Sequence, residues 1–247
     1  MRSVRDMEVR SVIMDGIKDG TREIETDTSM DKTQYKIAGI FPVPIIQIKF
    51  NQHHKYTFPT IEQEDHKPKG WRIPLNTTFP NIKEDDSFIS MKTADELKTD
   101  IKESIDSVFK ELNITTKYLI NEFWYNVYHK NQGQEVHTHL GPINPYWCGI
   151  YYNKNSTPTG FVKESGIHAV HNVPDWRDSK LNLFFLNNIE MSAEDGNIIL
   201  FPPYLKHYVP PQRKIDSDDK MRLTFSFNLY QITTMKHYAK NLEVNNE

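Results

Sequence analysis

Residues 221–229 read Met-Arg-Leu-Thr-Phe-Ser-Phe-Asn-Leu, with apolar and polar side chains in strict alternation. A period of two places alternate side chains on opposite faces of a β-strand. The strand is either half exposed, with its polar face outward, or part of a barrel whose polar face lines a cavity. Inside a cavity the guanidinium of Arg222 would need a partner, and its planar fork suits a carboxylate held by two parallel hydrogen bonds. The apolar face would carry Leu223, Phe225, Phe227 and Leu229, and the polar face Arg222, Thr224, Ser226 and Asn228.

Further strands are predicted before this one. Turn residues at 131–133 (Asn-Gln-Gly), 158–160 (Pro-Thr-Gly) and 195–197 (Asp-Gly-Asn) separate short runs of apolar and β-branched residues. Short strands divided in this way are typical of an antiparallel sandwich or barrel. The predicted strands are 41–50, 121–129, 147–153, 167–171, 181–187, 197–202 and 222–231.

One clear helix is predicted over residues 94–112. Thr93 followed by Glu96 forms a capping box at its start, and Asn113 suits its end. Because its apolar residues recur at helical spacing, one face should pack against the outside of a sheet. These residues are Leu97, Ile101, Ile105, Val108 and Leu112.

The 247-residue length fits a single β-rich domain, which we place at residues 37–247 with a core at 118–232. Residues 1–36 carry 7 Lys/Arg and 8 Asp/Glu, with Tyr35 as their one aromatic residue. Such a composition buries little, so this segment is predicted to be a weakly ordered arm. A short helix that docks on the domain or on a second subunit is the alternative, which leaves a homo-oligomer open.

The composition also bears on partners and compartment. A formal net charge of −3 gives no overall footprint for nucleic acid, so a nucleic-acid partner is not expected. The one cysteine, Cys148, allows no intrachain disulfide, which fits a cytoplasmic protein. The first residues lack the apolar region of a signal peptide, and no apolar run is long enough for a membrane span.

Two histidines two positions apart occur in residues 134–139, Gln-Glu-Val-His-Thr-His. If this stretch is extended, His137 and His139 point to the same side and can converge on one metal ion. Neutral imidazole is a common metal ligand. Two exposed loop histidines would give the same pattern.

A third histidine, His207, follows an apolar strand that ends in Phe201-Pro202-Pro203. A proline corner would set this histidine at the rim of a barrel. A surface histidine beside Lys206 is the alternative.

Taken in order, these three pieces resemble the 2-oxoglutarate/Fe(II)-dependent oxygenases. Their pattern is HxD or HxE, a distal histidine, and Arg-x-Ser/Thr on the last barrel strand, and the resemblance covers residues 118–232. The chain looks most similar to a poorly characterised branch with HxH, a strand of type SG-x-Y-Y and a segment LFPxxxxH. The corresponding residues are 148–152 (Cys-Gly-Ile-Tyr-Tyr) and 200–207.

The resemblance implies a double-stranded β-helix, the cupin-like jelly-roll barrel, with flanking helices. It implies that His137, His139 and His207 bind Fe(II). It further implies that Arg222, Thr224 and Tyr152 hold the far carboxylate of 2-oxoglutarate, with Tyr152 matching a prolyl-hydroxylase tyrosine. Asn126 matches a pocket-lining asparagine. The implied activity uses O2 to hydroxylate a substrate, a protein side chain or a small metabolite, with release of succinate and CO2.

His139 departs from the family pattern, which has a carboxylate at this position. Fe(II) bound by one carboxylate and two imidazoles carries a charge of +1, whereas three imidazoles leave +2. A higher charge should favour the dianionic co-substrate but alter the redox potential of the iron. Alternatively, Glu135 or Asp175 completes the site, or His139 is not a ligand.

Two other functions remain open from the sequence. A three-histidine cupin dioxygenase would use no keto acid, and Arg222 would then not face the metal. A non-catalytic β-barrel that acts as a binding or assembly module would have no affinity for Fe(II).

Overall fold

The computed structural model describes residues 22–23, 38–39, 43–61, 75–162, 188–191, 194–212 and 221–244. The chain divides into two units, residues 1–43 and 44–247. In the first unit, β1 (Arg22–Glu23) pairs with β2 (Ala38–Gly39) in antiparallel fashion. Apart from β1, the predicted arm 1–36 lies outside the described residues, as do the predicted strands 167–171 and 181–187 and the candidate ligand Asp175.

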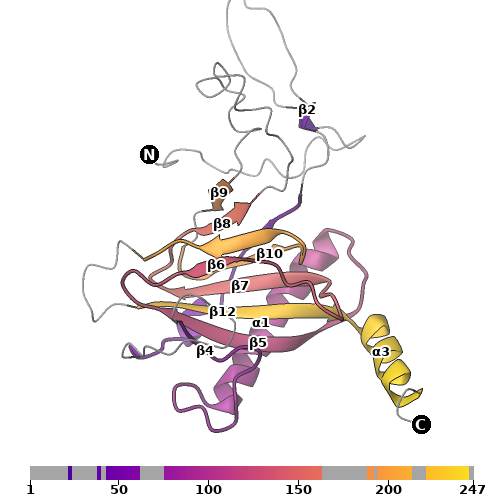
Figure 1. Ribbon diagram of the computed structural model, residues 1–247, viewed down its shortest axis with the longest axis horizontal. Helices are drawn as coiled ribbons and strands as arrows, with labels where there is room; N and C mark the ends of the chain where they lie inside the picture. Colours follow the sequence, from indigo (N-terminus) through magenta and orange to yellow (C-terminus); the bar gives the residue numbers. More distant parts are fainter. Residues whose placement is uncertain are drawn as a thin grey trace, which may run out of the picture. The chain divides into compact units, whose positions relative to one another are not determined.

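The second unit contains two antiparallel sheets (Figure 1). The larger sheet has the order β3 (Ile46–Lys49), β10 (Asn197–Phe201), β7 (Trp147–Lys154), β12 (Arg222–Gln231), β5 (Tyr118–Tyr128) and β4 (Asn76–Thr77). The smaller sheet has the order β6 (Gln134–His137), β11 (Lys206–Val209), β8 (Thr159–Val162) and β9 (Asn188–Met191). The predicted double-stranded β-helix is confirmed, although hydrogen bonding among the described strands does not close the two sheets into one barrel.

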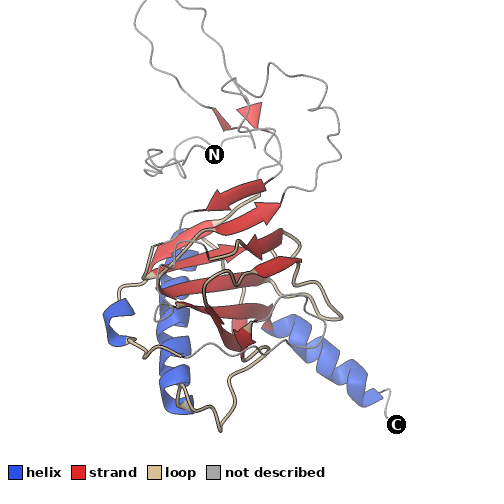
Figure 2. Cartoon of the chain, turned by 60° about the vertical axis from the view of Figure 1, so that its left-hand side comes forward, coloured by secondary structure: helices blue, strands red, loops and turns tan. Residues whose placement is uncertain are grey.

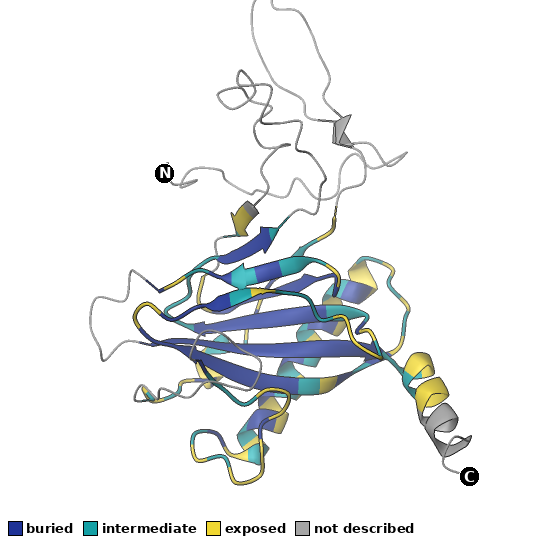
Figure 3. Cartoon of the chain, viewed as in Figure 1, coloured by how far each residue is buried: buried dark blue, intermediate teal, exposed yellow. Residues whose placement is uncertain are grey.

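Strand β12 lies at the centre of the larger sheet, paired along its length with β5 and with β7. Its apolar face joins the main hydrophobic core, and its polar face points toward the smaller sheet. All residues of β12 up to Tyr230 are buried, as the dark blue strands of Figure 3 show. The half-exposed interpretation of this strand is therefore wrong, and the cavity-lining interpretation is correct.

Helix α1 (Met91–Glu111) packs on the outer face of the larger sheet (Figure 2). It begins earlier than predicted, because the hydroxyl of Ser90 accepts a hydrogen bond from the Thr93 amide and caps the helix. Asn113 has a positive φ of 57°, as expected just beyond a helix end. The buried face is shifted slightly from the predicted one and consists of Ala94, Leu97, Ile101, Ile105 and Phe109.

The strands were predicted better where they are long. The predictions 121–129, 147–153, 197–202 and 222–231 match β5, β7, β10 and β12 within a few residues. Strands β8 and β11 were missed, since four residues are too few to establish a period. The C-terminal helix α3 (Ile232–Val244) and the 3-10 helix η1 (His53–Lys55) were also missed. No helix among the described residues is both long and apolar enough to cross a membrane.

A glycine lets β7 lie close to the aromatic core. A Cβ atom built on Gly149 would lie 2.2 Å from the ring of Phe227, the buried residue opposite it on β12. The aromatic ring occupies the space that any larger side chain at position 149 would need.

We therefore predict that Gly149→Ala lowers the free energy of unfolding by about 1–3 kcal/mol, the usual effect of overpacking. Gly141→Ala is the matched control, because the nearest atom to its added Cβ is 4.0 Å away. Chemical denaturation of both variants measures the difference. Equal stability of the two variants would contradict the packing described here, and Phe227→Leu should recover part of the loss in G149A.

Candidate active site

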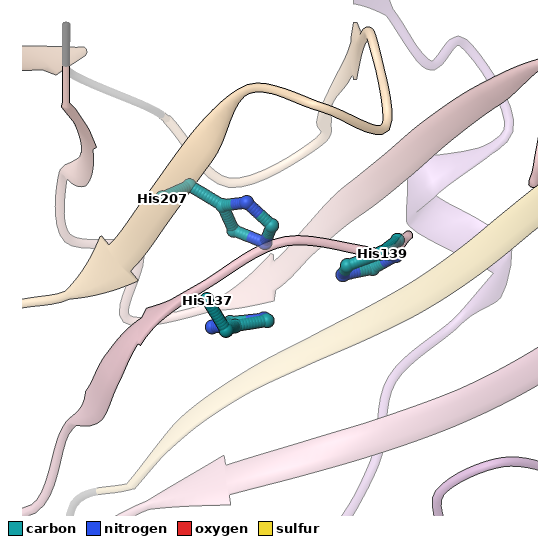
Figure 4. Close-up of side chains that lie close together, drawn as sticks. All are labelled: His137, His139 and His207. Atoms are coloured by element: carbon teal, nitrogen blue, oxygen red, sulfur yellow. The ribbon is translucent and has the colours of Figure 1, made fainter. Parts of the chain in front are cut away.

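Three histidines meet where the smaller sheet faces the larger one (Figure 4). His137 on β6 and His207 on β11 are cross-strand partners, and their ring centroids are 4.2 Å apart. His139 lies two residues beyond the end of β6, where its backbone amide donates to the Pro203 carbonyl at 3.0 Å. The three potential ligand atoms lie within 4.8 Å of one another. His207 is only 3% exposed, so the surface-histidine alternative is wrong.

Hydrogen bonds orient all three rings in the same way. The Nδ1 atom of His137 lies 2.8 Å from the Glu135 carbonyl, and that of His207 lies 3.1 Å from the Leu205 carbonyl. Because a carbonyl oxygen only accepts, both Nδ1 atoms must carry the proton. Each Nε2 atom is therefore unprotonated, and that of His137 lies 3.4 Å from the Gln134 Nε2 atom.

The ring of His139 is held by a side chain instead. Its Nδ1 atom lies 2.6 Å from Oδ1 of Asn228, and Nδ2 of Asn228 donates to Glu122 at 2.5 Å. Since the carboxylate takes the amide NH2 group, the amide oxygen faces His139 and accepts its Nδ1 proton. The Nε2 atom of this third ring is therefore also unprotonated.

Burial keeps the three imidazoles neutral. It lowers the pKa of His137 to about 4 and that of His139 below its ordinary value. The pKa of His207 lies well below the ordinary range, first through burial and then through the neighbouring His137 and His139. Neutral rings with unprotonated Nε2 atoms are the form that metal ions require.

The donor set fits a divalent transition-metal ion. Metal–imidazole bonds of about 2.1 Å would draw the three nitrogens to about 3 Å from one another. Borderline ions such as Fe(II) accept imidazole ligands. In the described part of the chain the group contains no carboxylate, and Glu135, a proposed substitute, is not part of it.

The same cavity reaches from the histidines to a buried arginine. Arg222 is 0% exposed, and its Nη1 atom donates to Thr157 Oγ1 at 3.0 Å. Its guanidinium carbon lies 5.0 Å from the ring centre of Tyr128 and 5.6 Å from that of Tyr152. Burial lowers the pKa of this guanidinium below its ordinary value. Among the described residues no carboxylate pairs with it, and its Nε atom has no hydrogen-bond partner.

The predicted co-substrate residues lie on or beside this cavity. Thr224 and Asn126 line it. The hydroxyl of Tyr152 lies 2.5 Å from Thr159 Oγ1, while its ring flanks the guanidinium of Arg222.

Sequence reasoning missed two residues that line the cavity, Tyr128 and Gln134, and the loop residue Thr157, which contacts Arg222. Tyr128 shares strand parity with Asn126, so its orientation could have been found from the alternation of β5. Thr157 lies in a loop, where no periodicity indicates its direction. Gln134 precedes the HxH motif, and its Oε1 atom accepts a hydrogen bond from the Tyr128 hydroxyl at 3.0 Å. The full lining is Trp124, Asn126, Tyr128, Gln134, His137, His139, Ile150, His207, Val209, Arg222, Thr224 and Ser226.

A larger, more open pocket lies on the other side of His137 and His139, which line both spaces. Its volume is about 850 Å³, against about 10 Å³ for the inner cavity, or roughly the space of one water molecule. Exposed apolar residues at its rim include Phe79, Val136 and Leu140. The histidines thus separate a small cationic cavity from a wide, largely apolar mouth.

One comparison with known proteins matches the region of the site to a family model. Residues 122–228 match the family model described as "Putative 2OG-Fe(II) oxygenase". They include all three histidines, Arg222, Thr224 and Tyr152. None of the curated proteins searched matches the sequence.

Several solved structures are similar at low identity. HygX from Streptomyces hygroscopicus, with nickel and 2-oxoglutarate bound, has 11% identity and a TM-score of 0.48, covering 77% of this chain and 84% of its own. A 2OG-Fe(II) oxygenase family oxidoreductase from Burkholderia pseudomallei has 9% identity and a TM-score of 0.43, with 64% and 74% covered. A prolyl-4-hydroxylase from Pseudomonas putida has 10% identity and a TM-score of 0.38, with 64% and 71% covered.

The lowered histidine pKa values predict how the stability of the metal-free protein depends on pH. The unfolded chain binds a proton at His137 near pH 6.5, whereas the folded chain binds it only near pH 4. The unfolded state therefore holds more protons between these values, and the free energy of unfolding falls as the pH drops through this window.

Each such histidine contributes a slope of about 1.4 kcal/mol per pH unit. His137→Asn should flatten the dependence between pH 6.5 and 4.5 by roughly this amount, as measured by urea unfolding across the pH range. An unchanged slope would mean that His137 is not held neutral by burial.

Proposed function

We propose that this chain, whose residues 122–228 belong to the 2OG-Fe(II) oxygenase family, is an Fe(II)- and 2-oxoglutarate-dependent dioxygenase that hydroxylates its substrate. Hydroxylation would consume O2 and convert 2-oxoglutarate to succinate and CO2. In this proposal His137, His139 and His207 hold the iron, and the inner cavity holds the co-substrate.

The observation that carries the proposal is the buried guanidinium of Arg222 in the cavity that the three histidines line, since no carboxylate among the described residues pairs with it. A buried cation without an anion is costly, so the site calls for an anionic ligand. A metal ion on the three neutral rings would add a second positive centre to the same cavity. A small dianion with a carboxylate at each end satisfies both centres at once.

Arg222 would hold the far carboxylate of 2-oxoglutarate, with the Thr224 hydroxyl as a further donor. The Nε atom of Arg222, which has no partner in the described residues, would donate to this carboxylate. The aromatic rings of Tyr128 and Tyr152 would keep the guanidinium in place on both sides. Asn126 donates through its Nδ2 atom to Ser226 Oγ at 3.1 Å. This hydrogen bond would fix the two polar side chains that line the cavity.

A bound iron ion would supply the redox chemistry that activates O2. The protein's own part is to present three Nε2 lone pairs and leave the remaining coordination positions open. The buried side chains of Trp124 and Ile150 line the cavity and would limit the entry of water.

The larger outer pocket would take the substrate. Its lining contains the carboxylates of Glu122 and Glu135 beside the apolar rim, and in the described part of the chain no lysine or arginine lines it. This charge pattern favours a neutral or cationic substrate, a protein side chain or a small metabolite, over a nucleic acid or a phosphorylated compound.

A three-histidine cupin dioxygenase that uses no keto acid is less well supported. In that case Arg222 would have no reason to line the same cavity as the histidines. A non-catalytic binding module would not need three rings that all offer an unprotonated Nε2 atom.

The proposal predicts a specific loss of co-substrate binding when the guanidinium is removed. Arg222→Ala should weaken the binding of 2-oxoglutarate by about 2–3 kcal/mol, or roughly 30- to 150-fold. This is the loss expected for hydrogen bonds to a charged group. Arg222→Lys keeps the charge but lacks the fork, so its affinity should lie between those of the parent protein and R222A. Anaerobic titration of the Fe(II)-loaded protein with 2-oxoglutarate, followed by the visible charge-transfer absorption, measures all three.

His207→Ala is the companion variant, since it should abolish the absorption by removing a metal ligand. Equal 2-oxoglutarate affinity in the parent protein and R222A would exclude the assigned role of the arginine. Failure of the parent protein to bind Fe(II) would leave the non-catalytic binding module as the better account.

A further inference from the structure

We propose that Glu122 and Asn228 are positioning residues for the metal centre. In this proposal, Asn228 holds His139 in its ligating form, and Glu122 supplies, one hydrogen bond further out, the negative charge that the family pattern places on the metal. The inference rests on the proposed function, in which His139 binds the iron.

The contacts form a continuous chain from the larger sheet to the third histidine. Glu122 on β5 and Asn228 on β12 are cross-strand partners. The carboxylate of Glu122 accepts from Asn228 Nδ2 at 2.5 Å and from the Tyr230 hydroxyl at 2.9 Å, both on its Oε2 atom. Asn228 in turn accepts from His139 Nδ1 at 2.6 Å. Asn228 is 4% exposed, so water competes little for these bonds.

Through these hydrogen bonds, Glu122 determines which ring nitrogen of His139 carries the proton. An amide can present either its oxygen or its nitrogen to a neighbour. Here the carboxylate can only accept, so it fixes the NH2 group on its own side and turns the oxygen toward His139. The imidazole must then place its proton on Nδ1, which leaves Nε2 for the metal.

The other two histidines do not depend on such a device. His137 and His207 donate to backbone carbonyls, that of Glu135 within β6 and that of Leu205 directly before β11. His139 lies beyond the end of β6, where no described backbone carbonyl accepts its proton. A side chain has to provide the acceptor, and Asn228 does so.

The position of the charge is the second part of the inference. Three imidazoles leave Fe(II) with a charge of +2, whereas the usual carboxylate reduces it to +1. Within the described residues no lysine or arginine pairs with Glu122, so its charge is not cancelled by a nearby cation. Polarisation through Asn228 makes His139 a stronger donor to the metal.

The test compares metal binding and the proton position on His139. Anaerobic titration with Co(II), a coloured substitute for Fe(II), gives the dissociation constant of the full-length protein. Two-dimensional 1H–15N NMR of the metal-free protein shows which ring nitrogen of His139 carries the proton. The NMR result does not require metal binding, so it tests the inference separately from the proposed function.

Glu122→Gln removes the charge with little change in shape, and Asn228→Ala removes the acceptor. Both should weaken Co(II) binding by about 10- to 100-fold, the usual effect of losing an outer hydrogen-bond partner of a metal-bound histidine. In both variants His139 should change from a single Nδ1-protonated form to a mixture. The double variant E122Q/N228D places a carboxylate directly beside His139 and should recover most of the Co(II) affinity.

Asn153→Ala is the matched control. Asn153 is an equally buried amide on β7, and it donates to the Tyr56 carbonyl at 2.8 Å and the Tyr151 hydroxyl at 3.0 Å. This variant should lose stability without losing Co(II) affinity.

The inference is overturned if E122Q binds Co(II) as tightly as the parent protein does and its His139 keeps the Nδ1 proton. It is equally overturned if the double variant binds no better than E122Q. If the parent protein binds no Co(II), the proposed function fails, and the NMR comparison still decides whether Glu122 and Asn228 orient the ring.

Discussion

The cross-strand pair of His137 and His207 is the contact on which the site depends. Antiparallel pairing of β6 with β11 brings together two residues 70 positions apart in the sequence, with ring centroids 4.2 Å apart. The buried His207 and the partly buried His137 disfavour each other's protonation, so the pair is kept neutral. His139 joins them because its backbone amide binds the Pro203 carbonyl in the loop before β11.

The two sheets contribute groups of different charge to the site. The larger sheet contributes a buried guanidinium from β12 on one side of the three histidines and the carboxylate of Glu122 from β5 on the other side. The smaller sheet contributes neutral rings between them. The charge of the inner cavity therefore favours an anionic ligand, while the outer pocket, with its acidic and apolar lining, suits a substrate of different charge. Both charged residues reach the site from the neighbouring strands β12 and β5, whose long ladder fixes their positions.

The sequence predicted the parts of the fold whose patterns are long. The alternation of residues 222–229 and the spacing of the apolar residues in α1 identified the central strand and the helix. Short strands such as β8 and β11 could not be found, because their pairing is decided by partners distant in the sequence. The three histidines and Arg222, which the resemblance named, line one cavity in the structure. The resemblance did not indicate Thr157, which lies in a loop. Nor did it indicate the hydrogen bonds that link Glu122 through Asn228 to His139, since bonds between different strands leave no local pattern in the sequence.

X-ray absorption at the iron edge of the anaerobic Fe(II)–2-oxoglutarate complex tests the central claim most directly, because imidazole rings give a characteristic outer-shell scattering that can be counted. The account predicts three imidazoles and no protein carboxylate on the iron, with one imidazole lost in an His139→Ala variant. A fit that requires two imidazoles and a carboxylate, unchanged in that variant, would contradict it.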